Sequence, residues 1–163
     1  MVAIVVAVLV GLAAANCTHL KSIEKPWIPD FIGEKPVLLD FFFNACEACN
    51  ENEEDLEKLL NLLSDKITFK AIEIDCDEGE HQKWVAKYHP EYEIIQSCDQ
   101  RLETLLGIST YPTLVVLTPE GGLLLSVQGE LSLLSLSEWE LHPQMEKILN
   151  VLKMTYPEQF SNL

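Results

Sequence analysis

The chain has 163 residues, which suits one domain of ordinary size, and 48% of them are hydrophobic, so a core can be buried. Acidic residues number 26 and basic residues 11, which leaves a formal net charge of −15. Basic groups are what displace counterions from nucleic acids and bind anionic lipids. This charge balance therefore disfavours both nucleic acids and membrane surfaces as partners.

The N-terminus is apolar from Val2 to Ala15. This stretch is shorter than the roughly 20 apolar residues of a membrane span, and it ends in small residues that suit a cleavage point. We therefore expect residues 1–16 to be a signal peptide. The mature protein would then be secreted or lie in the secretory-pathway lumen, without stable membrane association. A retained short anchor is the alternative, and residues 17–35 are expected to form an irregular lead-in.

The first elements of the folded part follow residue 36. Residues 37–43 form a nearly continuous apolar run, which predicts a strand buried on both faces of a parallel sheet. The spacing of the leucines that follow predicts a helix over 47–64, and an alternating pattern predicts a second strand over 67–75. A strand, a helix and a strand in this spacing imply a right-handed parallel crossover.

Shorter elements follow residue 75. The pattern predicts helices over 81–89, 99–106 and 144–155, an extended piece over 91–96, and two antiparallel strands over 113–118 and 123–128. One α/β domain with helices on a mixed central sheet accounts for these elements. We expect the domain to span residues 36–155 and residues 156–163 to be a C-terminal tail.

Cys46 and Cys49, with two residues between them, lie where the first predicted strand turns into a helix. A helix start has unpaired N–H groups and a positive dipole end, which stabilise a thiolate, the form of cysteine that attacks a disulfide. The spacing lets the second sulfur reach back and resolve a mixed disulfide. A zinc site and a purely structural disulfide are the alternatives. Cys76 and Cys98 are isolated in the sequence, so we expect no metal site.

Asp40 lies inside the first apolar strand, six residues before Cys46. An unpaired carboxylate is costly there, and the alternative is an acid that faces solvent at the strand end. If it is buried, its pKa rises toward neutrality, which suits a proton acceptor for Cys49.

Pro112 stands at the entrance of the strand over 113–118. A proline there can be an ordinary edge residue. A cis bond between Tyr111 and Pro112 would instead place the backbone beside Cys46, ready to pair with an extended substrate strand.

These segments together resemble a known family. Residues 36–49 are similar to the active-site strand of the thioredoxin superfamily, and residues 107–113 resemble its cis-proline loop. The long stretch over 75–107 and the segment over 115–122 look like the nucleoredoxin, tryparedoxin and TlpA-like branches. The resemblance covers about residues 35–155.

The resemblance implies a single thioredoxin-like domain, with a helix-plus-extended insertion before the cis-proline loop. It also implies a thiol–disulfide oxidoreductase of the reductase or isomerase type, in which Cys46 attacks, Cys49 resolves and Asp40 moves protons. The substrate-facing residues that it implies are Thr110, Tyr111 and Pro112. Such a protein needs no dissociable cofactor, and its partners are protein thiols or disulfides and an electron donor.

Two residues depart from the family pattern. Ala45 stands where the family usually has tryptophan, so a flat contact for substrates is missing. Glu47, next to the nucleophile, opposes thiolate formation, and we expect the helix start to outweigh this screened charge.

Two rival interpretations stay open. One is a non-catalytic binding or chaperone-like module of the same fold, and the other is a secreted structural protein whose cysteines are all paired. Cys76 and Cys98 are predicted near the carboxyl edge of the sheet, as a pair or as separate buried thiols. Redox activity requires that both sulfurs of Cys46 and Cys49 be open to solvent and that the loop of Pro112 face them.

Overall fold

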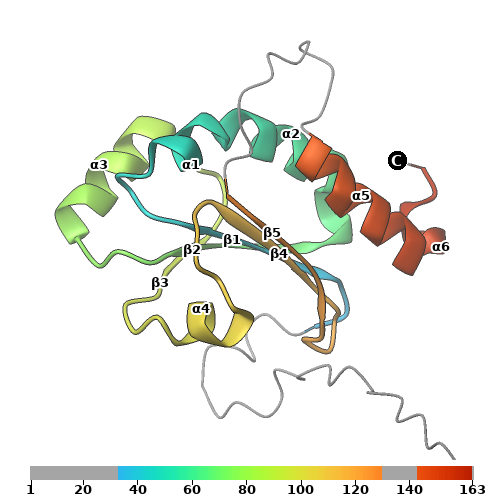
Figure 1. The fold of residues 1–163 in the computed structure, drawn as a ribbon. Helices are drawn as coiled ribbons and strands as arrows, with labels where there is room; N and C mark the ends of the chain where they lie inside the picture. Colours follow the sequence, from blue (N-terminus) through green and yellow to red (C-terminus); the bar gives the residue numbers. More distant parts are fainter. Residues whose placement is uncertain (1–32, 130–142, 163) are drawn as a thin grey trace, which may run out of the picture.

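The computed structural model describes residues 33–129 and 143–162. The predicted signal peptide and the lead-in as far as residue 32 lie outside the described residues. Figure 1 shows a sheet that runs through the middle of the described part, with most helices above it and α4 below it.

The described elements follow one another in the predicted order. The strands are β1 (Val37–Phe42), β2 (Thr68–Glu73), β3 (Ile94–Gln96), β4 (Thr113–Leu117) and β5 (Leu123–Gln128). The helices are α1 (Glu47–Glu51), α2 (Glu53–Leu63), η2 (Ser64–Lys66, a 3₁₀ turn), α3 (Glu78–Tyr88), α4 (Arg101–Leu106), α5 (Pro143–Thr155) and α6 (Pro157–Phe160). The predicted strands are confirmed with ends that move by a few residues, and so are the predicted helices other than the one over 47–64, which is divided.

The five described strands form one mixed sheet in the order β3-β2-β1-β4-β5. Strand β1 pairs in parallel with β2 and antiparallel with β4, and β2 pairs in parallel with β3. All six residues of β1 are buried, because this central strand is covered on both faces. The parallel pairing and the double burial predicted for this strand are confirmed.

The alternation of side chains along β1 divides the core into two layers. Leu38 packs with leucines of α2 and with α5, whereas Leu39 packs on the opposite face with Leu102 of α4. Burying such a side chain contributes about 2 kcal/mol each, so both layers stabilise the sheet. The face above the sheet carries α1, α2, α3 and α5 (Figure 1).

The helix predicted over 47–64 is divided at Asn52. The N–H of Asn52 donates to the carbonyl of Cys49 at 3.2 Å, three residues back instead of the four of an α-helix. Helix α1 ends at this 3₁₀-type bond. The carbonyl of Asn52 then accepts the N–H of Leu56 at 2.8 Å, which begins α2. Asparagine is a weak helix former, and this break places Glu53 at the first turn of a new helix.

The C-terminus departs from the tail expected over 156–163. Residues 157–160 form α6, which begins with Pro157 at its first turn. Phe160 has no exposed surface and belongs to the core beneath α5. The packed domain therefore continues to Phe160, because this one aromatic side chain is better buried than solvated.

Candidate functional site

Cys46 stands at the turn between β1 and α1. Its N–H donates to the carbonyl of Phe43 at 3.0 Å and closes the turn, and its Sγ accepts the N–H of Cys49 at 3.0 Å. Cys46 is therefore the N-cap residue of α1. A sulfur in this position receives a backbone N–H that would stabilise its thiolate.

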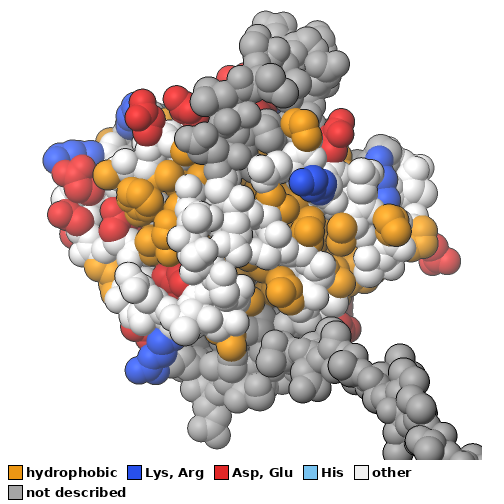
Figure 2. All heavy atoms as spheres, viewed as in Figure 1, with side chains coloured by type: hydrophobic (Ala, Val, Ile, Leu, Met, Phe, Trp, Pro, Cys, Tyr) orange, Lys and Arg blue, Asp and Glu red, His pale blue; other side chains and the backbone are white. Residues whose placement is uncertain are grey.

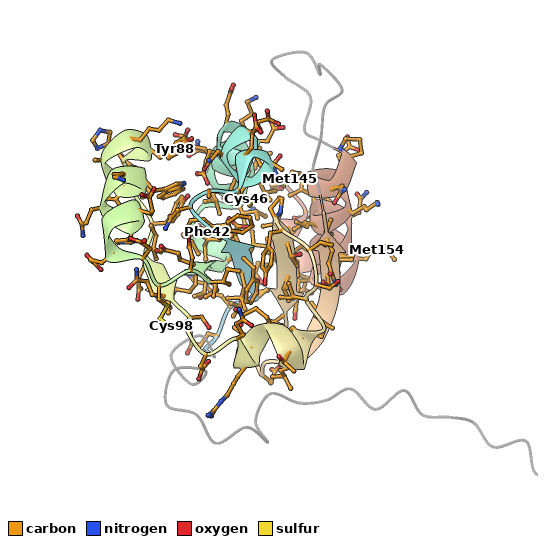
Figure 3. The ribbon with its side chains drawn as sticks, turned by 60° about the vertical axis from the view of Figure 1, so that its left-hand side comes forward. Phe42, Cys46, Tyr88, Cys98, Met145 and Met154 are labelled. Carbon is orange, nitrogen blue, oxygen red and sulfur yellow. A yellow bond between two sulfur atoms is a disulfide. The ribbon has the colours of Figure 1, made fainter. Side chains whose placement is uncertain are left out.

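Cys46 and Cys49 are joined by a disulfide with a Cα–Cα distance of 5.2 Å. The two residues are buried, at 5% and 4% exposure, so in the oxidised form the requirement of sulfurs open to solvent is not met beyond a small opening. An attacking thiolate has to reach a sulfur through this small opening. Figure 3 shows Cys46 on the helical side of the sheet, above Phe42.

Asp40 is buried in the middle of β1, with 5% of its surface exposed. Its neighbours two positions away on the same face are Leu38, which packs on α2, and Phe42, which packs with both cysteines. Desolvation, and secondly the charge of Glu53, raise the pKa of Asp40 to about 8. The structure thus places a buried carboxyl group whose pKa lies close to neutral pH, so that it can both accept and release a proton, on the face of the sheet shared by Phe42.

The loop before β4 lies beside the cysteines. The Tyr111–Pro112 peptide bond is cis, which the resemblance implied, and Pro112 is buried. The ring of Tyr111 packs edge-on against Phe43 with 5.7 Å between centroids, and it contacts the cluster that holds both sulfurs. The loop therefore faces the pair.

The backbone of this loop is paired on one side. The carbonyl of Pro112 accepts the N–H of Gly129 at 2.9 Å, and the carbonyl of Thr110 accepts the hydroxyl of Thr113 at 2.6 Å. Within the described part of the chain, the N–H and carbonyl of Tyr111 bond to no other backbone group. Thr110 is exposed, so this edge can be approached from solvent.

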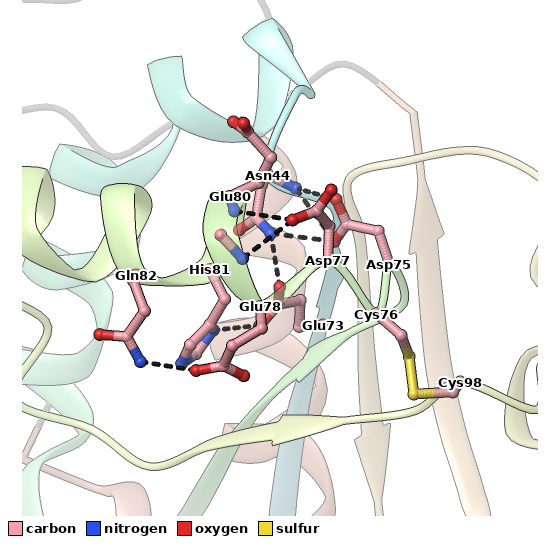
Figure 4. A network of polar contacts seen from close by, with 11 residues as sticks. Asn44, Glu73, Asp75, Cys76, Asp77, Glu78, Glu80, His81, Gln82 and Cys98 are labelled. Carbon is pink, nitrogen blue, oxygen red and sulfur yellow. Dashed lines mark hydrogen bonds and ion pairs between the residues drawn. A yellow bond between two sulfur atoms is a disulfide. The ribbon is translucent and has the colours of Figure 1, made fainter.

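A polar network that the sequence analysis did not predict supports the active-site turn (Figure 4). The carboxylate of Glu73, with no exposed surface, accepts the side-chain amide of Asn44 at 2.5 Å and lies 2.5 Å from Nδ1 of His81. Asp75 accepts the backbone N–H of Asn44 at 3.1 Å. Asn44 precedes Cys46 by two residues, so the network anchors the turn to the end of β2.

The signal for Glu73 was present in the alternation of β2. Phe69, Ala71 and Glu73 share the face that the helices cover, and a carboxylate at such a position needs hydrogen-bonding partners. The partners came from the turn and from α3, and their identity depends on tertiary packing that no local pattern contains.

Cys76 and Cys98 form a second disulfide with a Cα–Cα distance of 5.6 Å. Both residues are exposed, and the bond ties the end of β2 to the segment between β3 and α4. The alternative of separate buried thiols is thus wrong. In Figure 3, Cys98 lies well away from Cys46, toward α4.

The surface around the site is mixed in character. Figure 2 shows acidic side chains gathered over α1 and α3, next to a strip of hydrophobic side chains in the middle of the face. The described residues contain no group of three or more histidine, cysteine or acidic side chains arranged to hold a metal ion. No helix among them has the length and apolar character needed to cross a membrane.

Solved structures share this fold at low sequence identity. A secreted disulfide oxidoreductase of Mycobacterium tuberculosis, homologous to E. coli DsbE, is 22% identical, with a TM-score of 0.55 over 71% of this chain and 84% of that chain. An exposed lipoprotein thioredoxin of Streptococcus pneumoniae is 19% identical, with a TM-score of 0.60 over 78% of this chain and 89% of that chain. The predicted single thioredoxin-like domain, with its insertion before the cis-proline loop, is confirmed.

Curated relatives match a part of the chain. NHL repeat-containing protein 2 is 32% identical over 103 residues in both the chicken and the human protein, which is 59% of this chain. The match covers 14% of the length of these relatives. The chain therefore matches only a small part of the length of each relative.

A family model described as thioredoxin-like matches residues 33–123. This range is more than half of the 163 residues and includes the disulfide of Cys46 and Cys49 together with the cis Pro112. Sequence, sheet order and site geometry agree, and the chain belongs to the thioredoxin-like family.

Proposed function

We propose that the protein is a thiol–disulfide oxidoreductase that exchanges disulfides with protein clients through Cys46 and Cys49. The observation that carries this proposal is the sulfur of Cys46 at the N-cap of α1, bonded to Cys49 and accepting its N–H. A helix start favours the thiolate at the first sulfur, and the second sulfur lies within bonding distance of it.

The reaction consists of two sulfur transfers. In the reduced protein the thiolate of Cys46 attacks a client disulfide, an S–S bond forms between them, and one client thiolate leaves. Cys49 then gives its proton to Asp40 and attacks Cys46, which releases the second client thiolate. Two electrons pass to the client, and a dithiol donor returns them to the protein. The reverse sequence oxidises a client dithiol.

The loop of Pro112 supplies the client contact in this proposal. The backbone of Tyr111 has no backbone partner among the described residues, so it is free to bond an extended client segment as an added strand. The ring of Tyr111 against Phe43 forms an apolar wall beside the sulfurs. The small exposed surface of the pair favours a client segment that is extended rather than folded.

A non-catalytic binding module is the second candidate. The 5% exposure of Cys46 and the exposed Ala45 in place of a tryptophan both favour it, since they leave little sulfur and little flat surface for a client. Such a module would hold clients without a covalent step. The two functions therefore differ in whether the sulfur of Cys46 is needed.

A trapping experiment separates these functions. Cys49→Ser should accumulate a mixed disulfide between Cys46 and a peptide disulfide, seen as a mass increase that dithiothreitol reverses. Cys46→Ser should form no adduct, and the matched control Cys98→Ser with Cys76→Ser should cycle like the wild type. A Cys49→Ser protein that binds the peptide without a covalent adduct would support the binding module instead.

We also propose that the protein is secreted or lies in the secretory-pathway lumen. An exposed disulfide such as Cys76–Cys98 persists in oxidising compartments, which agrees with removal of residues 1–16 and a secretory or extracellular location. Mass spectrometry of the protein from a eukaryotic secretion host tests this directly. A chain that starts near residue 17 in the medium supports it, and an intact chain retained in the cell contradicts it.

A further inference from the structure

Once Asp40 has accepted the proton of Cys49 in the proposed reaction, it must release this proton to solvent. Asp40 is 5% exposed and lies in the central strand, between paired residues of β2 and β4. A buried acid that accepts a proton in one reaction cycle has to return it to solvent before the next. The route must pass through the face of the sheet that Asp40 shares with Leu38 and Phe42, because side chains two apart on a strand point the same way.

Glu53 is half-buried and lines a groove on the surface. The break at Asn52 makes Glu53 the first residue of α2, directly after the helix that carries Cys49. Tyr92, from the segment before β3, donates its hydroxyl to Glu53 Oε2 at 2.7 Å. The ring of Tyr92 packs edge-on against Phe69 with 5.0 Å between centroids, which fixes the hydroxyl in position.

Glu53 and Tyr92 line a groove of about 840 Å³ that Asp40 does not reach. The groove runs between the α1–α2 region and the segment that follows α3. Its other charged or titratable lining groups, besides Tyr88, are Glu51, Glu54, Glu57, His89 and Glu91. Glu53 thus faces this groove, and its charge acts on the buried Asp40.

The charges couple the two carboxyl groups. The charge of Glu53 raises the pKa of Asp40 further, after desolvation. Burial raises the pKa of Glu53 itself, while the hydroxyl of Tyr92 lowers it and Glu57 raises it. Desolvation, Glu53 and Asp40 also raise the pKa of Tyr92, so its hydroxyl stays a donor. Neighbouring carboxyl groups in such surroundings hold one proton between them more readily than they both ionise.

We propose that Glu53 is the relay that carries the proton between Asp40 and groove water, with Tyr92 holding its carboxylate in place. The inference rests on the proposed function, since it completes the resolving step. The proton leaves the thiol of Cys49 for Asp40, passes to Glu53 and then to solvent, while the S–S bond forms and the client thiolate departs. No electron moves along this path.

The first test measures the titration of Asp40 by carboxyl ¹³C NMR in the oxidised protein. In Glu53→Gln the oxygen that accepts from Tyr92 is kept and the negative charge is lost, so the Asp40 midpoint should fall by more than about 0.5 pH. The matched control is Glu54→Gln, because Glu54 is one residue further on α2 and its side chain is 82% exposed beside Lys58. This control should leave the midpoint within about 0.2 pH.

The second test measures the rate of exchange with a fluorogenic peptide disulfide in stopped flow, from acid to alkaline pH. Glu53→Gln should slow exchange about tenfold near neutrality and change the pH profile, and Glu54→Gln should stay within about twofold. In an Asp40→Asn background, Glu53→Gln should cause no further loss, because the relay acts through Asp40. A structural role of Glu53 would slow both backgrounds equally.

The outcomes distinguish the relay from the function on which it rests. The relay is overturned if Glu53→Gln leaves the titration midpoint of Asp40 unchanged. It is also overturned if Glu53→Gln slows exchange equally in the wild-type and the Asp40→Asn backgrounds. If the wild-type protein shows no exchange at all, the proposed function is overturned, and the relay step with it. This holds even if Glu53→Gln shifts the midpoint of Asp40, because such a shift shows only that the two carboxyl groups interact. Tyr92→Phe, which keeps the ring on Phe69, provides a second variant should Glu53→Gln fold poorly, with a smaller slowing in the same direction.

Discussion

The two disulfides of this protein differ in every physical property that governs exchange. Cys46 and Cys49 are 3 positions apart in the sequence and are buried, whereas Cys76 and Cys98 are 22 positions apart and are exposed. Exposure alone would make the second pair the reactive one. The groups around the sulfurs instead favour Cys46–Cys49 as the reactive pair.

The difference lies in which residue caps the following helix. Cys46 is itself the N-cap of α1, and its sulfur accepts a helix N–H. Cys76 precedes α3 by one more residue, and the carboxylate of Asp77 takes the N–H groups of Gly79 and Glu80 instead. A shift of one residue thus gives one sulfur the favourable end of a helix and gives the other a neighbouring carboxylate.

Removing the buried acid should have the largest effect, and it should affect the first disulfide only. Asp40→Asn should slow exchange by Cys46 and Cys49 about 100-fold near neutral pH, since Cys49 loses its proton acceptor. Stopped-flow exchange with a peptide disulfide measures this. Equal rates in the variant and the wild type would remove Asp40 from the mechanism.

The same variant should be more stable at alkaline pH. The pKa of Asp40 rises from 3.8 to about 8 on folding, so the folded state holds a proton that the unfolded state releases. The free energy of unfolding therefore falls as pH rises between these values, by at most about 6 kcal/mol at this one group. Urea titrations at both ends of this window should show that Asp40→Asn gains stability at the alkaline end only.

Removing the second disulfide should lower stability without stopping exchange. The combined change Cys76→Ser with Cys98→Ser opens a loop of 22 residues, which costs about 3 kcal/mol in the chain-entropy model. Thermal unfolding measures the loss, and the trapping assay measures exchange. A loss of exchange larger than the loss of folded protein would show that this disulfide also sets the active-site turn, through Asp75 and Asn44.

The two disulfides should open at different redox potentials. Cys46–Cys49 should be reduced at a less reducing potential than Cys76–Cys98, because a helix N–H stabilises the thiolate of the first pair, whereas Asp75, Asp77 and Asp99 are the sequence neighbours of the second. We expect the equilibrium constants to differ at least about tenfold. Thiol labelling at graded dithiothreitol ratios, read peptide by peptide, gives the order, and the reverse order would contradict the helix argument.

Much of this comparison could be predicted from local sequence. The apolar run of β1, the position of Cys46 at a helix start and the proline before β4 are short-range features, and each was predicted in place. The pairing of Cys76 with Cys98 was left open, because it depends on β3 joining the sheet edge beside β2. Glu73 and Glu53 were missed for the same reason, since their partners Asn44 and Tyr92 come from distant segments.

The break at Asn52 is the most instructive miss. The leucines from Leu56 to Leu63 have helical spacing, and the whole range 47–64 contains no proline or glycine, so one helix was the natural prediction. The chain nevertheless divides there, and the residue after the break is Glu53, whose charge raises the pKa of Asp40. Side-chain spacing reports which face is buried, but it does not report where the backbone changes its hydrogen-bonding partner.

The smallest expected effect concerns the charge beside the nucleophile. Glu47 lies in the first turn of α1 and is exposed, so water screens its repulsion of a thiolate at Cys46. Glu47→Gln should raise the fraction of thiolate at a given pH by no more than about threefold, seen by thiolate absorbance in the reduced protein. Glu51→Gln, at the other end of the same helix, is the matched control and should change the fraction less. No change, or a larger fraction in the wild type than in Glu47→Gln, would mean that Glu47 does not oppose the thiolate, and an increase far above threefold would mean that its charge outweighs the helix start.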